Sequence, residues 1–389
     1  MPIVNRIAEF HDEIAEWRQN IHAHPELLYE EHRTALFVEE KLKGFGLDEV
    51  VGGIGKTGIV GVIRGRKNGS GRVIALRADM DALPIEEKTG KDYASTIHGL
   101  MHACGHDGHT AMLLGAARYL AETRNFDGTV VVIFQPAEEG GAGAKAMIDD
   151  GLMQRWAIDE VFGMHNAPGL ALGSFAINSG AIMASTDEFD MLIEGDGGHA
   201  ARPQHCIDPL LIGMQVYQAL QTIVARNVDP QEAAVLSISA FNAGDAYNII
   251  PQRAHMRGTV RTMKAEVRDL VEKRMDEVVK NIAKAHGTHI EINYQRGYPM
   301  TVNHLEQTDF AAQVACEVVG DVKVDRARIP SMGGEDFAYM LEERPGAMIL
   351  IGNGDSAKLH HEEYDFNDAI IPVGCSYWIR LVERKLPVK

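Results

Sequence analysis

The sequence predicts an α/β fold in which a smaller α+β domain is inserted into a larger one. In the first and last thirds of the chain, short apolar runs bounded by Gly, Asp or Asn alternate with helical patterns, as in α/β sheets covered on both faces. The middle third follows a different order, βαββαβ. With 389 residues the chain is also longer than the roughly 250–300 residues that one hydrophobic core usually serves.

The larger domain is expected to begin with helices and to continue with buried strands. Apolar residues recur every three or four positions over residues 3–17 and again over 35–42, which predicts two amphipathic helices. A further helix is expected over 110–121, where Asp107 is placed to cap the first turn. Runs rich in Val and Ile predict buried strands at 60–63, 73–76, 130–134 and 347–351.

The middle third predicts the inserted domain, because its first strand alternates apolar and polar residues as a sheet with one solvated face does. The expected order is strand 188–194, helix 208–225, strands 233–241 and 254–262, helix 264–286 and strand 289–294. We therefore expect the larger domain in two parts, 1–180 and 296–389, around an inserted domain at 181–295.

Composition and charge exclude several classes of protein. With 45% hydrophobic and 24% charged residues, the chain lies in the range of globular proteins rather than disordered or fibrous ones. The formal net charge of −17 disfavours nucleic acid and anionic lipid surfaces as partners. Four well-separated cysteines without a CxxC pair, and no leader-like or membrane-spanning apolar stretch, favour a cytoplasmic protein.

One glycine-rich segment resembles a nucleotide-binding motif without fulfilling its requirements. Residues 53–58 (GIGKTG) match GxGxxG, but a strand pattern follows them where a dinucleotide-binding motif must open a helix. A phosphate loop is excluded too, because Val50 stands where its first glycine would be. The segment therefore predicts a glycine turn.

Four segments carry potential metal ligands. The densest is HACGHDGHT at 102–110, where Cys104 and His106 stand together before a helix. A buried strand ends in QPAEEGG, so that Glu138 and Glu139 lie where α/β folds place ligands. A third strand pattern ends at His165, and the fourth segment is LHH at 359–361.

Together these segments predict a site for two divalent cations. Cys104, His106, Glu139, His165 and one of the last two histidines would supply five ligands, with a water between the cations and the other carboxylate as general base. The acidic strand end RADMD at 77–81 is expected to orient these ligands. The alternatives are a nucleophilic Cys104 paired with a histidine, and purely structural histidines.

The sequence resembles the metal-dependent amidohydrolases that include hippurate hydrolase, N-acyl-amino-acid amidohydrolases and hydrolases of indole-acetyl-amino acids, within the aminoacylase and carboxypeptidase superfamily. The matching motifs run in order along almost the whole chain: HAHPELLYEE, RADMDALPI, MHACGHDGHT, FQPAEEGGAGAKAMIDDGL, GMHNAPGLALGSFA, GGHAARP, AYNIIPQRAHMRGTVRT, SMGGEDFAYML and LHHEEYDFND. The resemblance implies an exopeptidase-like catalytic domain with a mixed, mostly parallel sheet, and a ferredoxin-like lid domain through which a homodimer or homotetramer assembles.

The resemblance also implies roles for individual residues. Glu138 would be the general base, and the lid residue His199 would steady the oxyanion. Asn248 and Arg261 would bind substrate, although for Arg261 a structural ion pair is an equal alternative. The two divalent cations, Zn, Mn, Ni or Co, would be held by Cys104, His106, Glu139, His165 and His360. The family commonly has one histidine at the last position, so His361 is an alternative to His360.

These expectations define a hydrolase that cleaves the amide bond of an N-acyl or N-aroyl amino acid to a carboxylic acid and a free amino acid. A dipeptidase or carboxypeptidase with the same metals is the main alternative, and a non-catalytic metal-binding or ligand-binding relative is less favoured because Glu138 is present. The sequence leaves open the acyl group, the subunit in which His199 and Asn248 act, and the roles of Glu335 and Asp336.

Overall fold

The computed structural model of the chain describes residues 3–388, which form two compact units. The first unit holds the chain up to Gly180 together with Val302–Ile329 and the residues from Asp336 onward, and the second holds Ala181–Thr301 and Pro330–Glu335. Residues 296–301 and 330–335, which we expected in the larger domain, thus group with the second unit. Hydrogen bonds explain this difference, because the Tyr298 and Ser331 amides donate to Thr186 Oγ1 and Ile182 O (3.0 and 2.9 Å).

An eight-stranded sheet forms the centre of the first unit. Its strands, in spatial order, are β1 (Glu49–Ile54), β2 (Gly58–Arg64), β4 (Thr129–Gln135), β3 (Val73–Asp79), β5 (Glu160–Pro168), β16 (Gly346–Gly354), β6 (Phe175–Ala176) and β15 (Val324–Asp325). The central pairs β4–β3, β3–β5 and β5–β16 are parallel, whereas β2 runs antiparallel to its neighbours. The predicted mixed, mostly parallel sheet is confirmed, and residues 55–57 of the predicted glycine turn connect β1 to β2.

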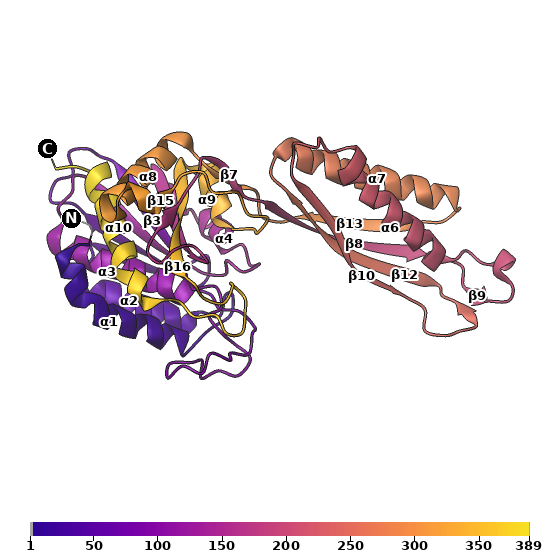
Figure 1. Cartoon of the computed structure of the whole chain (residues 1–389), viewed down its shortest axis with the longest axis horizontal. Helices are drawn as coiled ribbons and strands as arrows, with labels where there is room; N and C mark the ends of the chain where they lie inside the picture. The colour runs from indigo at the N-terminus through magenta and orange to yellow at the C-terminus, as the bar shows by residue number, and fades with distance from the viewer. Residues whose placement is uncertain (1–2, 389) are drawn as a thin grey trace. The chain divides into compact units, whose positions relative to one another are not determined.

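Helices cover both faces of this sheet (Figure 1). One face carries α1 (Asn5–His22), α2 (His32–Gly44), α3 (His106–Thr123), α8 (Leu305–Val319) and α10 (Ile371–Lys385). The other carries α4 (Gly143–Asp149), α5 (Leu152–Arg155) and α9 (Phe337–Glu343). Neighbouring residues of a strand point to opposite faces. Accordingly, Leu76 and Phe162 pack toward α3 and α10, whereas Gly163 faces Phe337 of α9.

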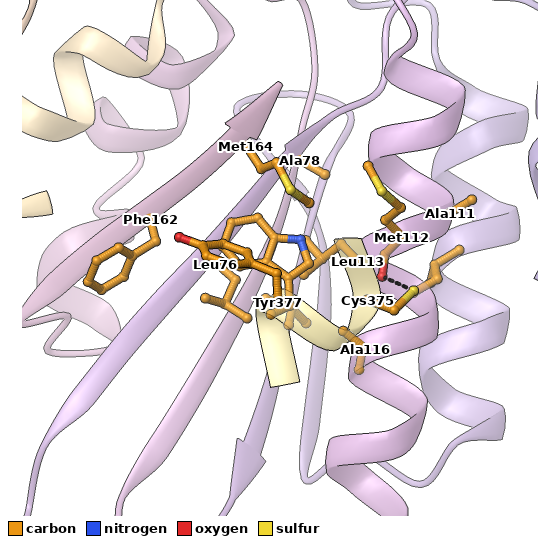
Figure 2. Close-up of a cluster of buried hydrophobic side chains, with 14 of the residues drawn as sticks. Leu76, Ala78, Ala111, Met112, Leu113, Ala116, Phe162, Met164, Cys375 and Tyr377 are labelled. Atoms are coloured by element: carbon orange, nitrogen blue, oxygen red, sulfur yellow. Dashed lines mark hydrogen bonds between the residues drawn. The ribbon is translucent and has the colours of Figure 1, made fainter. Parts of the chain in front are cut away.

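Figure 2 shows the core between the sheet and the helices α3 and α10. The Cys375 thiol of α10 donates a hydrogen bond to the Met112 carbonyl of α3 (3.1 Å). A Cβ atom at Gly374 would lie 2.1 Å from Met112 Sδ, so the close approach of the two helices requires glycine there. This packing fixes α3, whose first residue is His106 and which Cys104 precedes by two positions.

Helix α3 begins earlier than the sequence predicts, and Asp107 does not cap it. Its first residue is His106, and the residue before it, Gly105, has a left-handed backbone (φ 94°). The Asp107 carboxylate instead accepts a hydrogen bond from His22 Nδ1 of α1 (2.8 Å). The expected cap was wrong because this tertiary partner, distant in sequence, takes the carboxylate.

The second unit contains a four-stranded antiparallel sheet with two helices. In chain order its elements are β8 (Ser185–Glu194), α6 (Pro209–Arg226), β10 (Ala234–Ala243), β12 (Arg253–Thr262), α7 (Ala265–Ala285) and β13 (Ile290–Arg296). The spatial order β10-β12-β8-β13 is that of a ferredoxin-like fold, as predicted. The side chain of Asp208, the residue before α6, caps this helix by accepting from the Leu210 amide (2.9 Å).

The remaining elements are short. Two ribbons pair β9 (Gly198–His199) with β11 (Ile249–Ile250) and β7 (Gly180–Met183) with β14 (Thr301–Asn303). Three 3-10 turns lie at η1 (Pro203–His205), η2 (Asp321–Lys323) and η3 (Asp368–Ile370). None of the helices in the described part of the chain has the length and apolar character needed to cross a bilayer.

Candidate metal centre

The first unit gathers all five predicted ligands at the carboxyl ends of its parallel strands. Their ligand atoms lie within 4.8 Å of one another in overlapping groups. These groups are Cys104, His106 and His165; Cys104, Glu139 and His360; and His106, Glu138 and Glu139. Cations are favoured at this edge of a parallel sheet because strands from distant parts of the sequence end there together.

Hydrogen bonds aim the Nε2 atoms of two histidines into the cluster. His165 Nδ1 donates to the Asn166 carbonyl (2.7 Å), and His165 Nε2 lies 3.4 Å from Cys104 Sγ. His106 Nδ1 donates to the Asp81 carbonyl (2.9 Å). His106 Nε2 is buried and has no hydrogen-bond partner within residues 3–388. Metal-binding histidines show this pattern, in which one ring nitrogen is held by an oxygen and the other is left for the cation.

Carboxylates next to Cys104 and His106 oppose the loss of a proton from each of these two groups. Burial and the nearby carboxylates of Glu139 and Glu138 raise the pKa of the Cys104 thiol well above its usual range. Burial opposes the charge on His106, yet Asp79 and Asp81 raise its pKa to about 10. Both groups therefore keep a proton that a bound cation would replace.

Glu139 and His360 close the cluster on its solvent side. His360 Nε2 lies 3.0 Å from Glu139 Oε1, and this contact raises the pKa of the half-exposed His360. Burial disfavours the charge of Glu139, but His360 and His106 hold its pKa below the usual range. His361 does not join the cluster, because its Nδ1 accepts from the Glu363 amide (3.1 Å).

The residues present fit a pair of divalent cations. The donor set of one thiol, three imidazoles and a carboxylate is of the kind that first-row transition metals prefer. His106 Nε2, which is buried, has no hydrogen-bond partner among residues 3–388 and lies 3.7 Å from Asp79 Oδ2, would be satisfied by a cation bound there. The five residues predicted as ligands lie close to one another, and their role as ligands stays a prediction.

A second set of buried side chains holds the ligands in place. The Asn166 amide donates to His109 Nε2 (2.9 Å), so His109 carries its proton on Nδ1, which donates to Asp79 (2.6 Å). The Asn166 side chain also donates to the Cys104 carbonyl (2.6 Å). Sequence reasoning gave His109 and Asn166 no role, although each lies within a motif that it had singled out.

Glu138 lies beside the ligand cluster and is 6% exposed. Its Oε1 accepts from the Asp336 amide at 3.4 Å. Asp336 itself is fully buried and accepts from Arg77 Nη2 (3.2 Å) and Gln135 Nε2 (2.7 Å). Glu335 belongs to the second unit, where its carbonyl accepts from Thr301 Oγ1 (3.3 Å). These contacts place Asp336 near the predicted base.

The remaining predicted residues, His199, Asn248 and Arg261, all belong to the second unit. His199 and Asn248 lie together on the β9–β11 ribbon, both exposed, with the Asn248 carbonyl accepting from the Ala200 amide (3.0 Å). Arg261 lies near the far end of β12, half-buried, and donates to the Val260 carbonyl (3.1 Å) and to Thr259. An ion pair of Arg261 with a lid carboxylate, the alternative from the sequence, is not formed in the part of the chain that the structure describes.

Comparison with known proteins places the chain in a family. The model of peptidase family M20/M25/M40 matches residues 75–384. Hippurate hydrolase of Campylobacter jejuni is 44% identical over 99% of this chain and 100% of its own length. N-acetyl-L-cysteine deacetylase of Bacillus subtilis is 41% identical over 93% of this chain and 85% of its own.

A solved structure extends the comparison to three dimensions. A Bacillus subtilis protein described as a dinuclear metal binding peptidase of the M20 family superposes with a TM-score of 0.85 at 35% identity, covering 97% of this chain and 99% of the other. At this coverage the match spans both units. The chain therefore belongs to peptidase family M20/M25/M40, among its metal-dependent amidohydrolases.

Proposed function

We propose that the chain hydrolyses the amide bond of N-acyl or N-aroyl amino acids of the hippurate type, releasing a carboxylic acid and a free amino acid. The observation that carries the proposal is the buried ligand cluster with the carboxylate of Glu138 beside it. The relatives named hippurate hydrolase and N-acetyl-L-cysteine deacetylase support the substrate class.

Two divalent cations would be held by Cys104, His106, Glu139, His165 and His360. When bound, they supply Lewis acidity, which lowers the pKa of a coordinated water and polarises the amide carbonyl. A thiolate ligand favours zinc, whereas the imidazole and carboxylate ligands also accept manganese, nickel or cobalt.

The protein's own residues move the protons and orient the substrate. Glu138 would accept a proton from the attacking water and deliver it to the amine nitrogen as the C–N bond breaks, because an amine does not leave readily as an anion. His199 is our candidate donor to the oxyanion, a contact worth about 3–4 kcal/mol of barrier in other enzymes. Asn248 and Arg261 would bind the substrate, with the Arg261 guanidinium pairing with its carboxylate.

We also infer a homodimer, from the positions of these residues within the second unit. Strand β12 pairs with β8 from Arg253–Glu194 at one end to Thr262–Ser185 at the other. The ribbon with His199 and Asn248 continues from the first end, whereas Arg261 lies near the second, about 25 Å away at 3.3 Å per residue. One small substrate cannot contact both ends of β12. His199 and Asn248 would therefore act in one active site and Arg261 of the same chain in another.

A row of exposed apolar side chains supports the same inference. On α6, Leu211, Met214 and Tyr217 are 49%, 49% and 41% exposed and follow one another at helical spacing. Beside them the edge strand β10 exposes Val235 and Phe241. An apolar helix face next to an open strand edge is typical of a contact between protein chains.

The setting that we propose for the enzyme is a reducing compartment such as the cytoplasm. All four cysteines are free, and Cys104 and Cys375 are buried as thiols. Disulfides would be expected to form more often in an oxidising compartment. The site also needs a free thiol at Cys104 to bind metal.

The main alternative is a dipeptidase or carboxypeptidase with the same chemistry at the carbonyl. The family description and the solved M20 structure, both of which name a peptidase, favour this as the second candidate. Turnover of hippurate, acetyl-amino acids and dipeptides by metal-free protein reconstituted with one cation at a time separates the two. Faster turnover of dipeptides than of every acyl-amino acid would contradict our proposal.

Replacing Glu138 by Gln tests the mechanism. The variant should bind as much metal as the wild type but lose turnover by a factor of about 10²–10⁴, the usual contribution of a general base. Metal content by mass spectrometry and kcat on hippurate provide the two readings. Near-normal kcat in Glu138→Gln would remove Glu138 as the base.

A further inference from the structure

The segment between β4 and α4, which carries Glu138 and Glu139, has a strained backbone. Ala137 and Ala142 have left-handed φ angles of 51° and 54°. Residues other than glycine rarely adopt this backbone conformation. Each such residue costs on the order of 1 kcal/mol and persists only where its surroundings impose it. Contacts from other parts of the fold must therefore stabilise the conformation of this segment.

Three buried carboxylates hold it by accepting its backbone N–H groups. Glu31 accepts from the Ala137 amide (2.8 Å), Asp81 from the Glu139 amide (2.9 Å) and Asp336 from the Ala144 amide (2.9 Å). All three are at most 1% exposed. They come from separate places in the fold: before α2, after β3 and before α9. The segment is thus fixed on both sides of Glu138.

Of the three carboxylates, Glu31 has the fewest contacts with other functional groups. Asp81 also contacts the proposed ligand His106, and Asp336 forms an ion pair with Arg77. The carboxylate of Glu31, in contrast, accepts from Thr57 Oγ1 (2.6 Å) and from the Ala137 amide. Burial raises its pKa, which shows that the position is costly for a carboxylate. The hydrogen bond from the Ala137 amide is the structural role that we assign to this buried carboxylate.

We propose that Glu31 is a positioning residue for the general base: it fixes the backbone at Ala137 so that the Glu138 carboxylate points at the substrate side of the ligand cluster. This inference rests on the proposed function, in which Glu138 is the base. Tyr29 reinforces the anchor, because its hydroxyl donates to the Gly141 carbonyl (2.6 Å) from the same short segment. A displacement of about 1 Å in such a group typically costs on the order of 10²-fold in rate.

Two substitutions distinguish the length of the Glu31 side chain from its negative charge. Glu31→Asp keeps the carboxylate but withdraws it by one C–C bond, about 1.5 Å, from the Ala137 amide. Glu31→Gln removes the charge but keeps an oxygen at the same reach, while the Thr57 hydroxyl can turn to accept from the new amide. If Glu31 only supplied charge or bulk to the core, Glu31→Gln would be the damaging change.

The experiment uses the metal-loaded protein with hippurate as substrate. We expect Glu31→Asp to lower kcat by about 10–100-fold, as removal of supporting hydrogen bonds does elsewhere, with KM and metal content within about twofold of wild type. Glu31→Gln should keep most of the wild-type kcat. As a matched control, Glu26→Ala removes a carboxylate that accepts from the Arg33 and Thr34 amides and caps α2. It should lower Tm and leave kcat unchanged.

Each contrary outcome has a defined meaning. Wild-type kcat in Glu31→Asp, or a loss in Glu31→Gln as large as in Glu31→Asp, overturns the inference. A loss of metal in step with kcat also overturns it, because Glu31 would then act on metal retention through Glu139. If Glu31→Asp does not fold, Glu31→Gln decides alone: a kcat as low as that of Glu138→Gln contradicts positioning through the hydrogen bond. Normal kcat in Glu138→Gln itself would refute the proposed base instead.

Discussion

The Cys104 thiol has an environment that suits a metal ligand and not a nucleophile. A nucleophilic cysteine needs a lowered pKa, usually from a nearby cation or helix N-terminus. Burial and the carboxylates of Glu139 and Glu138 instead raise the pKa of Cys104 well above its usual range. The thiol is thus held protonated until a cation arrives. The alternative of a catalytic Cys104 is disfavoured on this ground.

Replacing Cys104 by Ala should therefore lower metal binding. We expect an affinity loss beyond the roughly 10–100-fold that outer contacts contribute, because a direct ligand is removed. Metal content after dialysis, measured by mass spectrometry, checks this. Cys375→Ala is the matched control, since that thiol is equally buried but contacts only the α10–α3 core. Full metal retention in Cys104→Ala would exclude Cys104 from the ligand set.

At the scale of single residues, the sequence predicts those that stand in local motifs. Glu139 and His165 stand at the ends of strand patterns and Cys104 directly before a helix pattern, so one edge of the sheet brings them together. Glu31 and Asn166 escaped prediction, because what they do depends on contacts made only in the fold. The contact of Glu31 with Ala137 joins residues 106 positions apart, and no local pattern indicates such a pair.

Helix α6 has an exposed apolar face that supports the proposed dimer. Its buried side packs on the four-stranded sheet, as an amphipathic helix should. Its opposite side carries the exposed apolar row of Leu211, Met214 and Tyr217 instead of the charged residues expected at a solvated surface. This face and the separated positions of His199 and Arg261 lead to the same proposal of a dimer.

Mixing two inactive variants tests that proposal. Glu138→Gln and His199→Ala should each be inactive alone, since each lacks one proposed group. If His199 acts in the partner's site, half of the randomly mixed dimers contain one complete site out of two, so about a quarter of wild-type activity returns. Unfolding and refolding the two together, followed by a hippurate assay, provides the measurement. No recovery in verified mixed dimers would contradict the proposed exchange.

Met214→Glu is the control for this experiment. A carboxylate in the middle of the exposed apolar row should dissociate the dimer, because burying an unpaired charge is costly. Sedimentation should then show a monomer, and mixing should restore no activity. A dimer that survives this change would place the interface elsewhere.

At the scale of elements, the periodic segments of the second unit were predicted well, whereas helices α8 and α10 of the first unit were missed. The βαββαβ order of the second unit is confirmed, because its helices and strands each bury one face. Helix α10 was not predicted. Its first turn contains Pro372 and Gly374, which suggest a loop, and the helix is buried on most sides. Proline is in fact tolerated in a first turn, and Gly374 is required by Met112.

At the scale of the whole molecule, a buried charge network joins α1 to the N-terminus of α3. His22 is fully buried, with Nδ1 2.8 Å from Asp107 and Nε2 3.3 Å from Glu87. Arg18 shares Asp107 (3.4 Å), while the rings of Tyr93 and His102 lie beside His22. Because both ring nitrogens face carboxylates, His22 is held in its charged form. This network ties together elements far apart in sequence that sequence patterns could not pair.

The charge on His22 predicts how stability depends on pH. Burial and Arg18 oppose that charge, but Asp107 and Glu87 raise the pKa of His22 to about 9. The pKa of His22 is thus higher in the folded than in the unfolded protein, so protonation of His22 stabilises the fold. This contribution to the free energy of unfolding is complete below about pH 6.5 and is lost as the pH rises through about 9.

The lost contribution should be measurable against a variant without the imidazole. Between pH 6.5 and 9.5, the free energy of unfolding of the wild type should fall toward that of His22→Gln by up to about 3 kcal/mol. Urea unfolding followed by tryptophan fluorescence measures this, since all three tryptophans belong to the first unit, as His22 does. The wild type should unfold at lower urea as the pH rises, whereas the variant should change much less. A difference between the two proteins that stays constant over this range would show that His22 is neutral in the folded state.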